Sequence, residues 1–278
     1  MDPADRPLVE RIVRVALKED LAAGDATTDA FVPADARAKG ALEFRQAAVV
    51  CGLAVAHLVF DKVDKNLVFK YATDDGDAIG PGDTAATVLG RARSLMKAER
   101  TALNLLQRMC GIATMTRAFV EALPGIEVYD TRKTTPGLRV LEKYAVRVGG
   151  GHNHRADLSQ IMIKYNHIEA AGADAIAAQL ATETRPVIAE ATTVEMAERW
   201  AAFACVRRVM LDNMPADAIR DAVMRLRRVR EGLVIEVSGG VTLATAAALR
   251  DTGIDAVSVG ALTHSVPAVD IGLELSRI

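Results

Sequence analysis

Positively charged and ionisable side chains are concentrated in three short segments between residues 130 and 167. Their sequences are Asp130-Thr-Arg-Lys-Thr-Thr-Pro-Gly137, Gly149-Gly-Gly-His-Asn-His-Arg155 and Ile163-Lys-Tyr-Asn-His167. Guanidinium groups bind carboxylates and phosphates in a bidentate manner, and ammonium groups add a compact charge on a flexible stem. The concentration of such groups predicts a pocket for a small polyanion.

The charge of the whole chain argues against a polymeric anion as the ligand. The formal net charge is -2 and the pI is about 6.2, so the protein lacks the overall positive field that nucleic-acid binding uses. Cys51, Cys110 and Cys205 are widely separated and show neither a CxxC pair nor a zinc-ligand spacing. We expect a reducing, cytoplasmic setting.

Neither a targeting segment nor a membrane span is expected. From Met1 to Leu21, apolar residues recur at helical spacing among charges, which predicts an amphipathic surface helix rather than a signal peptide. The most apolar run, residues 47–56, is shorter than the roughly 20 residues that a spanning helix needs.

The pattern of apolar and polar residues changes near residue 100. Before that point the runs 41–45, 67–71 and 84–89 alternate in hydrophobicity and predict strands of an open sheet with one solvated face. A long helix is predicted from about Ser94 to Leu123. Beyond residue 126, strand-like runs alternate with helical stretches, which predicts βαβ units and a parallel sheet. These runs are 127–129, 161–163, 187–189, 208–211, 233–237 and 256–259.

Polar residues or glycines follow each of these predicted strands. In order, they are Arg132 with Lys133, Lys164, Glu190, Asp212, Ser238-Gly-Gly240 and Gly260-Ala261. Parallel α/β barrels build their active sites from the loops at the carboxyl ends of the strands, and phosphate commonly binds near the last ones. The pattern predicts one site that holds an anion near the first strands and a phosphate near the last.

Several longer strings of the chain are more specific than single residues. They are Ala98-Glu-Arg-Thr-Ala-Leu-Asn104, the segments starting at Asp130 and Gly149, Leu211-Asp-Asn213, Ser238-Gly-Gly240 and Val259-Gly-Ala-Leu-Thr-His-Ser265. These strings resemble the quinolinate phosphoribosyltransferase family, also called carboxylating nicotinate-nucleotide pyrophosphorylase. The resemblance covers almost the whole chain in the expected order.

The resemblance implies a fold and an assembly. The family fold is an N-terminal α/β sandwich domain plus an open parallel α/β barrel, similar to a TIM barrel with fewer strands. We expect the sandwich in residues 1–102, with 270–278 packing back on it, and the barrel in residues 103–269. Family members work as dimers in which an arginine crosses into the neighbouring site, and Arg100 matches that arginine.

The resemblance also implies a reaction and its residues. Quinolinate and phosphoribosyl pyrophosphate give nicotinate mononucleotide, pyrophosphate and CO2, with Mg²⁺, on the route to NAD. The catalytic residues would be Lys133, Lys164, Glu190 and Asp212, with Glu190 and Asp212 also on the metal side. The substrate-binding residues would be Arg100, Arg132, Lys133, His154, Arg155 and Lys164, and the phosphate-binding residues Ser238, Gly239, Gly240 and Gly260.

The residue types suit this chemistry. Two adjacent carboxylates on a pyridine ring need several fixed cations. The anomeric carbon becomes oxocarbenium-like as pyrophosphate leaves, so Glu190 or Asp212 can stabilise the developing positive charge. The alkylated ring nitrogen then accepts the electrons released by decarboxylation, and no protein nucleophile is needed.

Two other readings remain open at this point. Lys164 could form a Schiff base in a barrel lyase. A relative that binds a pyridine carboxylate or phosphosugar without turnover is also conceivable, because the chain departs from the family at two places. Tyr165 stands where an acidic or small polar residue is usual, and Ile188 where an acid is common.

Overall fold

The computed structural model describes residues 5–278, which fall into two compact units. Among these residues, unit 1 contains residues 5–117, 134–150 and 262–278, and unit 2 contains residues 118–133 and 151–261. The expected division between residues 102 and 103 lies inside one continuous helix, α4 (Ala92–Ala122). Residues 1–4 of the expected N-terminal helix lie outside the described part, and α1 spans Arg6–Asp20.

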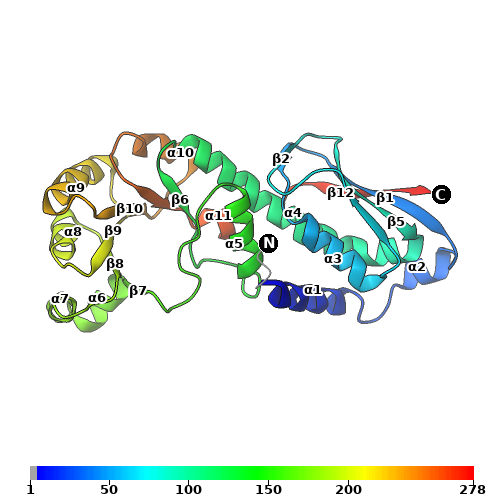
Figure 1. The fold of residues 1–278 in the computed structure, drawn as a ribbon, viewed down its shortest axis with the longest axis horizontal. Coiled ribbons are helices and arrows are strands. Elements are labelled where there is room, and N and C mark those ends of the chain that lie inside the picture. Colours follow the sequence, from blue (N-terminus) through cyan, green and yellow to red (C-terminus); the bar gives the residue numbers. More distant parts are fainter. Residues whose placement is uncertain (1–4) are drawn as a thin grey trace. The chain divides into compact units, whose positions relative to one another are not determined.

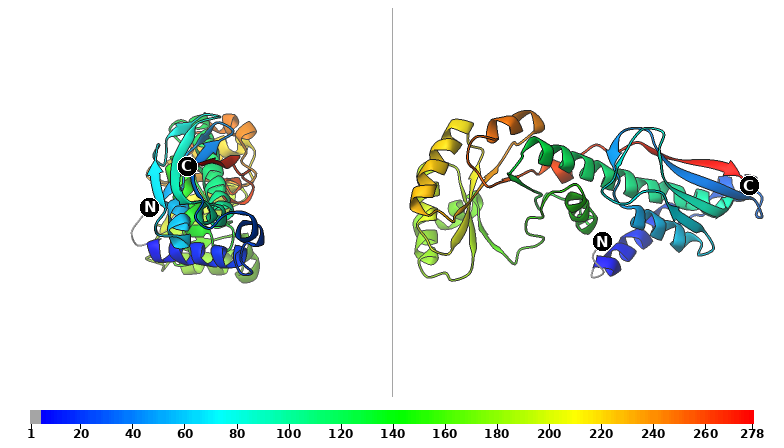
Figure 2. Two further views of the ribbon diagram at one scale, coloured as in Figure 1. Left: turned by 90° about the vertical axis from the view of Figure 1, so that its right-hand side faces the viewer. Right: turned by 45° about the horizontal axis from the view of Figure 1, so that its top comes forward.

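Unit 1 is built on an antiparallel sheet in the order β12-β1-β5-β3. Its strands are β12 (Ile271–Arg277), β1 (Arg37–Phe44), β5 (Thr84–Arg91) and β3 (Val68–Tyr71). Every second residue of β1 is buried, as expected for a strand with one face on the core. Strand β12 lies beside β1 over seven residue pairs, from Ala38 with Arg277 to Phe44 with Ile271 (Figures 1 and 2).

Short elements complete unit 1. They are α2 (Ala26–Phe31), β2 (Ala48–Val49), which pairs with β4 (Ala78–Ile79), α3 (Leu53–Val63) and α5 (Arg139–Val148). Helix α5 is fixed by Glu142, a nearly fully buried carboxylate that binds Arg108 on α4. The same guanidinium donates to the hydroxyl of Thr135 and the carbonyl of Thr263, so one side chain joins three separate segments.

Unit 2 is built on a six-stranded, wholly parallel sheet in the order β6-β11-β10-β9-β8-β7 (Figure 1). Its strands are β6 (Glu127–Tyr129), β7 (Ile161–Ile163), β8 (Val187–Ala191), β9 (Val206–Asp212), β10 (Val234–Ser238) and β11 (Ala256–Ser258). Strands β6 and β7 form the two edges among the described residues, so the barrel is open. The predicted fold class is confirmed.

Helices connect the strands of unit 2. They are α6 (Tyr165–Ala171), α7 (Ala173–Leu180), α8 (Val194–Ala201), α9 (Ala216–Val229), α10 (Leu243–Ala246) and the 3-10 turn Ala247–Leu249. Helices α8 and α9 each bury an apolar face. Helix α11 (Ala261–His264) follows β11, and its residues from Leu262 on belong to unit 1. On α8, the buried Trp200 donates from its indole nitrogen to the carbonyl of Glu190, 3.2 Å away. This bond fixes the end of β8.

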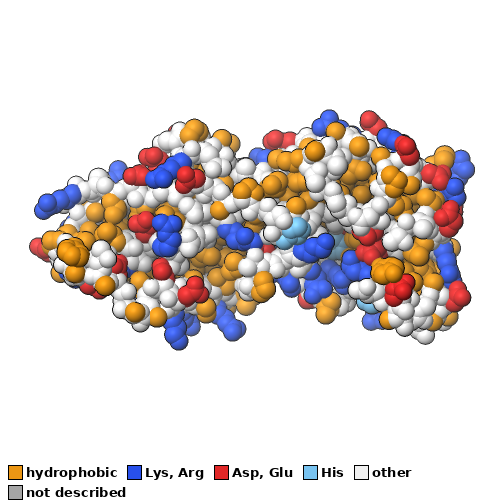
Figure 3. All heavy atoms as spheres, turned by 180° about the vertical axis from the view of Figure 1, so that it is seen from behind, with side chains coloured by type: hydrophobic (Ala, Val, Ile, Leu, Met, Phe, Trp, Pro, Cys, Tyr) orange, Lys and Arg blue, Asp and Glu red, His pale blue; other side chains and the backbone are white. Residues whose placement is uncertain are grey.

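None of the helices in residues 5–278 combines the length and the apolar character that a membrane crossing requires. On the face drawn in Figure 3, Lys and Arg side chains are interspersed with acidic and apolar ones.

Candidate active site

Four of the predicted polar residues lie along one edge of the parallel sheet in unit 2. Lys164 follows β7, Glu190 lies near the end of β8, and Asp212 and Ser238 are the last residues of β9 and β10. Asp212 and Ser238 are also register partners on neighbouring strands. The carboxyl ends of parallel strands meet at one edge, which is where barrel enzymes place their chemistry.

Lys164 and Glu190 form an ion pair at this edge. The Lys164 ammonium lies 2.7 Å from Oε2 of Glu190, and the backbone N–H of Tyr165 donates to Oε1 at 3.1 Å. Glu190 is buried, whereas the Lys164 side chain is 43% exposed. The pair places a fixed carboxylate with one accessible cation beside it, and this use of Lys164 as a cationic donor does not favour a Schiff-base role.

Asp212 is held in place by two donors. The Ser238 hydroxyl donates to Oδ1 at 2.8 Å and the Asn213 amide to Oδ2 at 2.9 Å. Carboxylate oxygens have further lone pairs, so these bonds orient Asp212 and leave it able to accept from a ligand.

The loop after β10 has an unusual backbone. Gly239 and Gly240 have φ angles of 87° and 61°, and Asn213 is a non-glycine residue with positive φ, at 54°. A Cβ at residue 239 would lie 2.4 Å from the Asn213 side chain, so only glycine fits. Successive N–H groups in such turns form anion-binding concavities. The helices that follow Gly240 and Gly260 have four residues each, so their dipoles contribute little.

Asp130 draws two of the cationic segments together. It is fully buried and accepts from the Asn153 amide at 3.0 Å and from the backbone N–H of His154 at 2.7 Å. The backbone of His152 also pairs with that of Tyr129 at the end of β6. The segment that ends in Arg155 is therefore fixed beside the one that contains Arg132.

The charges of Arg132 and Arg155 act on one another. Burial, and then the positive charge of Arg132, lower the pKa of the Arg155 guanidinium, and Asp157 partly offsets this. Among the described residues, the buried Nε of Arg132 has no hydrogen-bond partner. A polyanion would relieve the repulsion and supply an acceptor, so both observations fit an anionic ligand. Lys133 is exposed, and its backbone N–H donates to Thr131.

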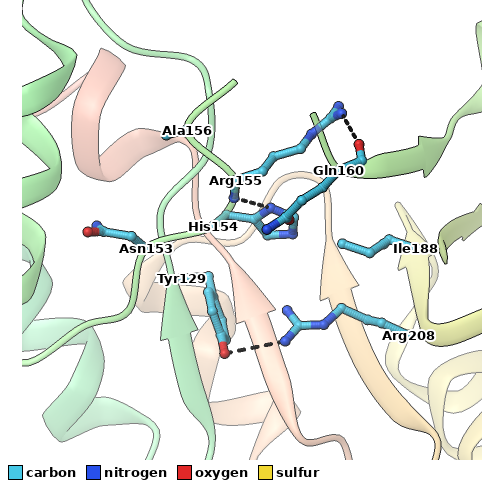
Figure 4. Close-up of a pocket in the computed structure, with 8 residues that line it drawn as sticks. All are labelled: Tyr129, Asn153, His154, Arg155, Ala156, Gln160, Ile188 and Arg208. Carbon is cyan, nitrogen blue, oxygen red and sulfur yellow. Dashed lines mark hydrogen bonds between the residues drawn. The ribbon is translucent and has the colours of Figure 1, made fainter. Parts of the chain in front are cut away.

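A cavity of about 350 Å³ opens beside Arg155 in unit 2 (Figure 4). Two predicted site residues, His154 and Arg155, line this cavity, as does Ile188 from β8. Residues that the sequence did not single out complete it. Its lining is Tyr129, Asn153, His154, Arg155, Ala156, Gln160, Ile188 and Arg208.

The unpredicted part is a buried polar network. Glu236 is fully buried and is bound by Arg208 and by the Ser258 hydroxyl, and Nε2 of His154 lies 3.7 Å from it. Burial alone would raise the pKa of Glu236, but His154, Arg208 and Ser258 together hold it below its ordinary value. The alternation of side chains between the two faces of a strand could have indicated this network. Arg208 and Glu236 are charged residues within apolar strand runs, and they lie on the same face as Asp212 and Ser238.

The remaining predicted residues lie as follows. Arg100 is on α4 in unit 1, 59% exposed and 3.8 Å from Glu99. Gly260 follows β11, the last strand of unit 2, and directly precedes α11. His167 caps α6 by accepting from the backbone N–H of Lys164. Tyr165 is exposed at the start of the same helix.

Comparison with known proteins agrees with this architecture. The quinolinate phosphoribosyl transferase N-terminal domain matches residues 25–110, and the C-terminal domain of the same family matches residues 112–274. The nicotinate-nucleotide pyrophosphorylase [carboxylating] of Mycobacterium leprae is 44% identical over 95% of both chains. The quinolinate phosphoribosyltransferase [decarboxylating] 1b of Nicotiana tabacum is 36% identical over 95% of this chain and 81% of its own.

Solved structures of similar proteins share the fold of this chain. NadC from Streptococcus pyogenes covers 100% of both chains at 40% identity with a TM-score of 0.90. The nicotinate-nucleotide pyrophosphorylase from Francisella tularensis covers 99% of this chain and 98% of its own at 34% identity, with a TM-score of 0.88.

Fold, strand-end site and comparisons together define a phosphoribosyltransferase of the open-barrel class. Within that class, the chain belongs to the quinolinate phosphoribosyltransferase family. The predictions of family, enzyme class and place in NAD biosynthesis are confirmed.

Proposed function

We propose that the protein transfers the phosphoribosyl group of phosphoribosyl pyrophosphate to quinolinate at the strand ends of unit 2. Decarboxylation then gives nicotinate mononucleotide, with pyrophosphate and CO2. One observation carries the proposal. The cavity at His154 and Arg155 is also lined by Ile188 and Arg208, and these two residues lie on the strands β8 and β9 that carry the fixed acids Glu190 and Asp212.

The dicarboxylate is gathered by cations held in place before it arrives. Arg132 and Arg155 repel each other in the free protein, so a bound dianion relieves both. His154 lines the cavity, Lys164 follows β7, and the exposed Lys133 adds charge for the pyrophosphate. Such pre-organised cations act strongly because no rearrangement is needed on binding.

Two acids serve the ribose. Glu190 is anchored by Lys164, Tyr165 and, through its carbonyl, Trp200. Asp212 is oriented by Ser238 and Asn213. Fixed carboxylates of this kind stabilise positive charge at the anomeric carbon as pyrophosphate departs. The pyridine nitrogen attacks that carbon as the bond to pyrophosphate breaks. The pyridinium formed stabilises the electron pair left on the ring carbon when CO2 departs, and a proton then takes the place of CO2 on that carbon.

Glu190 and Asp212 suit a magnesium ion that is held jointly by protein carboxylates and the substrate. Among residues 5–278, no group of three or more carboxylate, histidine or cysteine side chains is placed so that it could hold a metal ion, so an all-protein cage is absent there. Mg²⁺ commonly binds to one or two carboxylates plus substrate phosphates and water. Asp212 and Glu190 would hold such an ion, which would neutralise charge on the leaving pyrophosphate.

The glycine turn after β10 binds the 5′-phosphate in this proposal. Gly239 and Gly240 present a backbone of positive φ next to the Ser238 hydroxyl, and Gly260 follows the neighbouring strand β11. Backbone N–H donors of this kind bind phosphate without a side-chain charge.

We also propose a homodimer with shared active sites, in which Arg100 of one subunit reaches the site of the other. The exposure of Arg100 leaves its guanidinium available for such a contact. A cytoplasmic setting is proposed because Cys51, Cys110 and Cys205 are all free thiols.

The deciding experiment is product formation by the purified protein with quinolinate, phosphoribosyl pyrophosphate and Mg²⁺. Nicotinate is run in parallel as the substrate that lacks the second carboxylate. Nicotinate mononucleotide from quinolinate but not from nicotinate is the expected result. Binding of quinolinate without product would refute the transfer reaction.

A further inference from the structure

Arg208 lines the cavity but belongs to none of the strings that carry the family resemblance. We propose that Arg208 is a further substrate-binding, specificity-determining residue, which receives one carboxylate of the pyridine dicarboxylate at the sheet side of the cavity. The inference rests on the proposed function for the identity of its ligand. Four observations support it: orientation, spare donors, apolar surroundings and a buried counter-charge.

The first observation is where the guanidinium points. Arg208 projects from β9 into the cavity, and its Nη2 lies 3.3 Å from the Tyr129 hydroxyl (Figure 4). Its guanidinium carbon is 4.6 Å from the centre of the Tyr129 ring. Arg155, the other arginine of the lining, instead directs its guanidinium to the carbonyl of Gln160 at 3.3 Å (Figure 4). The two arginines thus offer separate positions for carboxylate groups.

The second observation is the donor capacity of Arg208. A guanidinium has five N–H donors in a planar fork. The bond to Glu236 comes from Nη1 and the long bond to Tyr129 from Nη2. These two bonds leave donors for a carboxylate, which arginine binds in bidentate geometry.

The third observation is the apolar wall beside Arg208. Ile188 is its register partner on β8, so the two side chains lie next to each other on the same face of the sheet. The Tyr129 ring forms the opposite contact. These surfaces suit the flat pyridine ring, and by excluding water they strengthen the bond between guanidinium and carboxylate.

The fourth observation is that Glu236 keeps the guanidinium in place. This carboxylate is fully buried beneath Arg208 and is also bound by Ser258. Glu236 offsets part of the charge that Arg208 adds to a site already containing Arg155. A side chain held in this way loses little further entropy when a ligand binds.

The design of the variants follows from that burial. Loss of Arg208 alone leaves the buried negative charge of Glu236 without its arginine partner, which lowers the stability of the fold. Arg208→Lys keeps a cation for Glu236 but removes the planar fork. The double variant R208M/E236Q removes both charges together. Arg207→Met is the matched control, because Arg207 is the adjacent, exposed residue of β9 and lies on the other face of the sheet.

The experiment compares binding constants for quinolinate, pyridine-2-carboxylate and pyridine-3-carboxylate by calorimetry, with the KM for phosphoribosyl pyrophosphate and the melting temperature of each variant. For R208K and R208M/E236Q we expect quinolinate affinity to fall about 10- to 100-fold. One monocarboxylate should lose affinity by a similar factor and the other should change little. The KM for phosphoribosyl pyrophosphate and all values for R207M should stay close to wild type.

The proposal is overturned if a folded variant binds quinolinate as tightly as wild type. Equal losses for both monocarboxylates, or a loss confined to phosphoribosyl pyrophosphate, would overturn it as well, because a general change of the site would explain them. Wild-type protein that binds quinolinate without turnover refutes the proposed reaction, and the binding comparison still decides the role of Arg208.

Discussion

The ion pair between Lys164 and Glu190 allows a quantitative test of the site. We expect Lys164→Met and Glu190→Gln to lower kcat by about a hundredfold or more, because each removes a fixed charge next to the reacting ribose. The pair has an Nζ–Oε2 distance of 2.7 Å, and its carboxylate is buried.

The effect on stability is smaller and can be estimated. A charge-assisted hydrogen bond contributes about 1.5–3 kcal/mol, and solvent screening of the 43%-exposed lysine reduces this to about 1–2 kcal/mol. A double-mutant cycle on the free energy of unfolding, measured by denaturant titration, should give a coupling energy of that size. The matched control is Arg185 with Glu183, a pair of the same 2.7 Å length whose arginine is 72% exposed. Its coupling energy should be smaller than that of Lys164 with Glu190, because solvent screens the exposed arginine.

The reasoning would be refuted by a coupling between Lys164 and Glu190 below about 0.5 kcal/mol, the range of simple additivity. Full turnover in a folded Glu190→Gln protein would equally remove Glu190 from the catalytic residues. Activity without any loss in Lys164→Met would assign that lysine to structure alone.

Four further results are expected. Gly239→Ala should lose affinity for phosphoribosyl pyrophosphate and about 1–3 kcal/mol of stability, since its Cβ would lie 2.4 Å from a neighbouring side chain and its φ is 87°; unchanged KM and melting temperature would contradict this. Inactive Arg100→Ala and Lys133→Ala proteins, mixed and refolded, should regain partial activity if sites are shared between subunits, whereas fully inactive mixtures would argue against sharing. Tyr165→Asp should change the KM for phosphoribosyl pyrophosphate or the turnover, because a negative charge would enter next to the acid-bearing strand end; identical kinetics would show that position 165 does not tune the site. Burial raises the pKa of Cys110 to about 12, so this thiol should resist alkylation at pH 8 until the protein unfolds, as mass spectrometry of labelled protein can test.

The strands of unit 2 were predictable because each is a short apolar run between polar or glycine punctuation. The predicted run 127–129 matches β6, and 161–163 matches β7, residue for residue. The helix expected from Ser94 to Leu123 is α4, displaced by two residues at its start and one at its end.

The network around Glu236 could not be predicted from local patterns. It depends on which strands are neighbours, and the sheet places β6 next to β11, the first and the last strand of unit 2 along the chain, with Glu127 and Ala256 as register partners. Arg208 and Glu236 meet only because β9 and β10 are adjacent in this register. Sequence alone marked each as a polar residue within an apolar strand, without its partner.

The pairing of β12 with β1 has a consequence for synthesis of the protein. Strand β1 ends at Phe44, yet its partner on one side is residues 271–277. Chains emerge from the ribosome N-terminus first. The backbone N–H and C=O groups on one edge of β1 therefore have no strand partner until the segment through residue 277 has been translated. Completion of the first sheet is therefore a late event in synthesis, and until then the open edge of β1 is exposed to pairing with other chains.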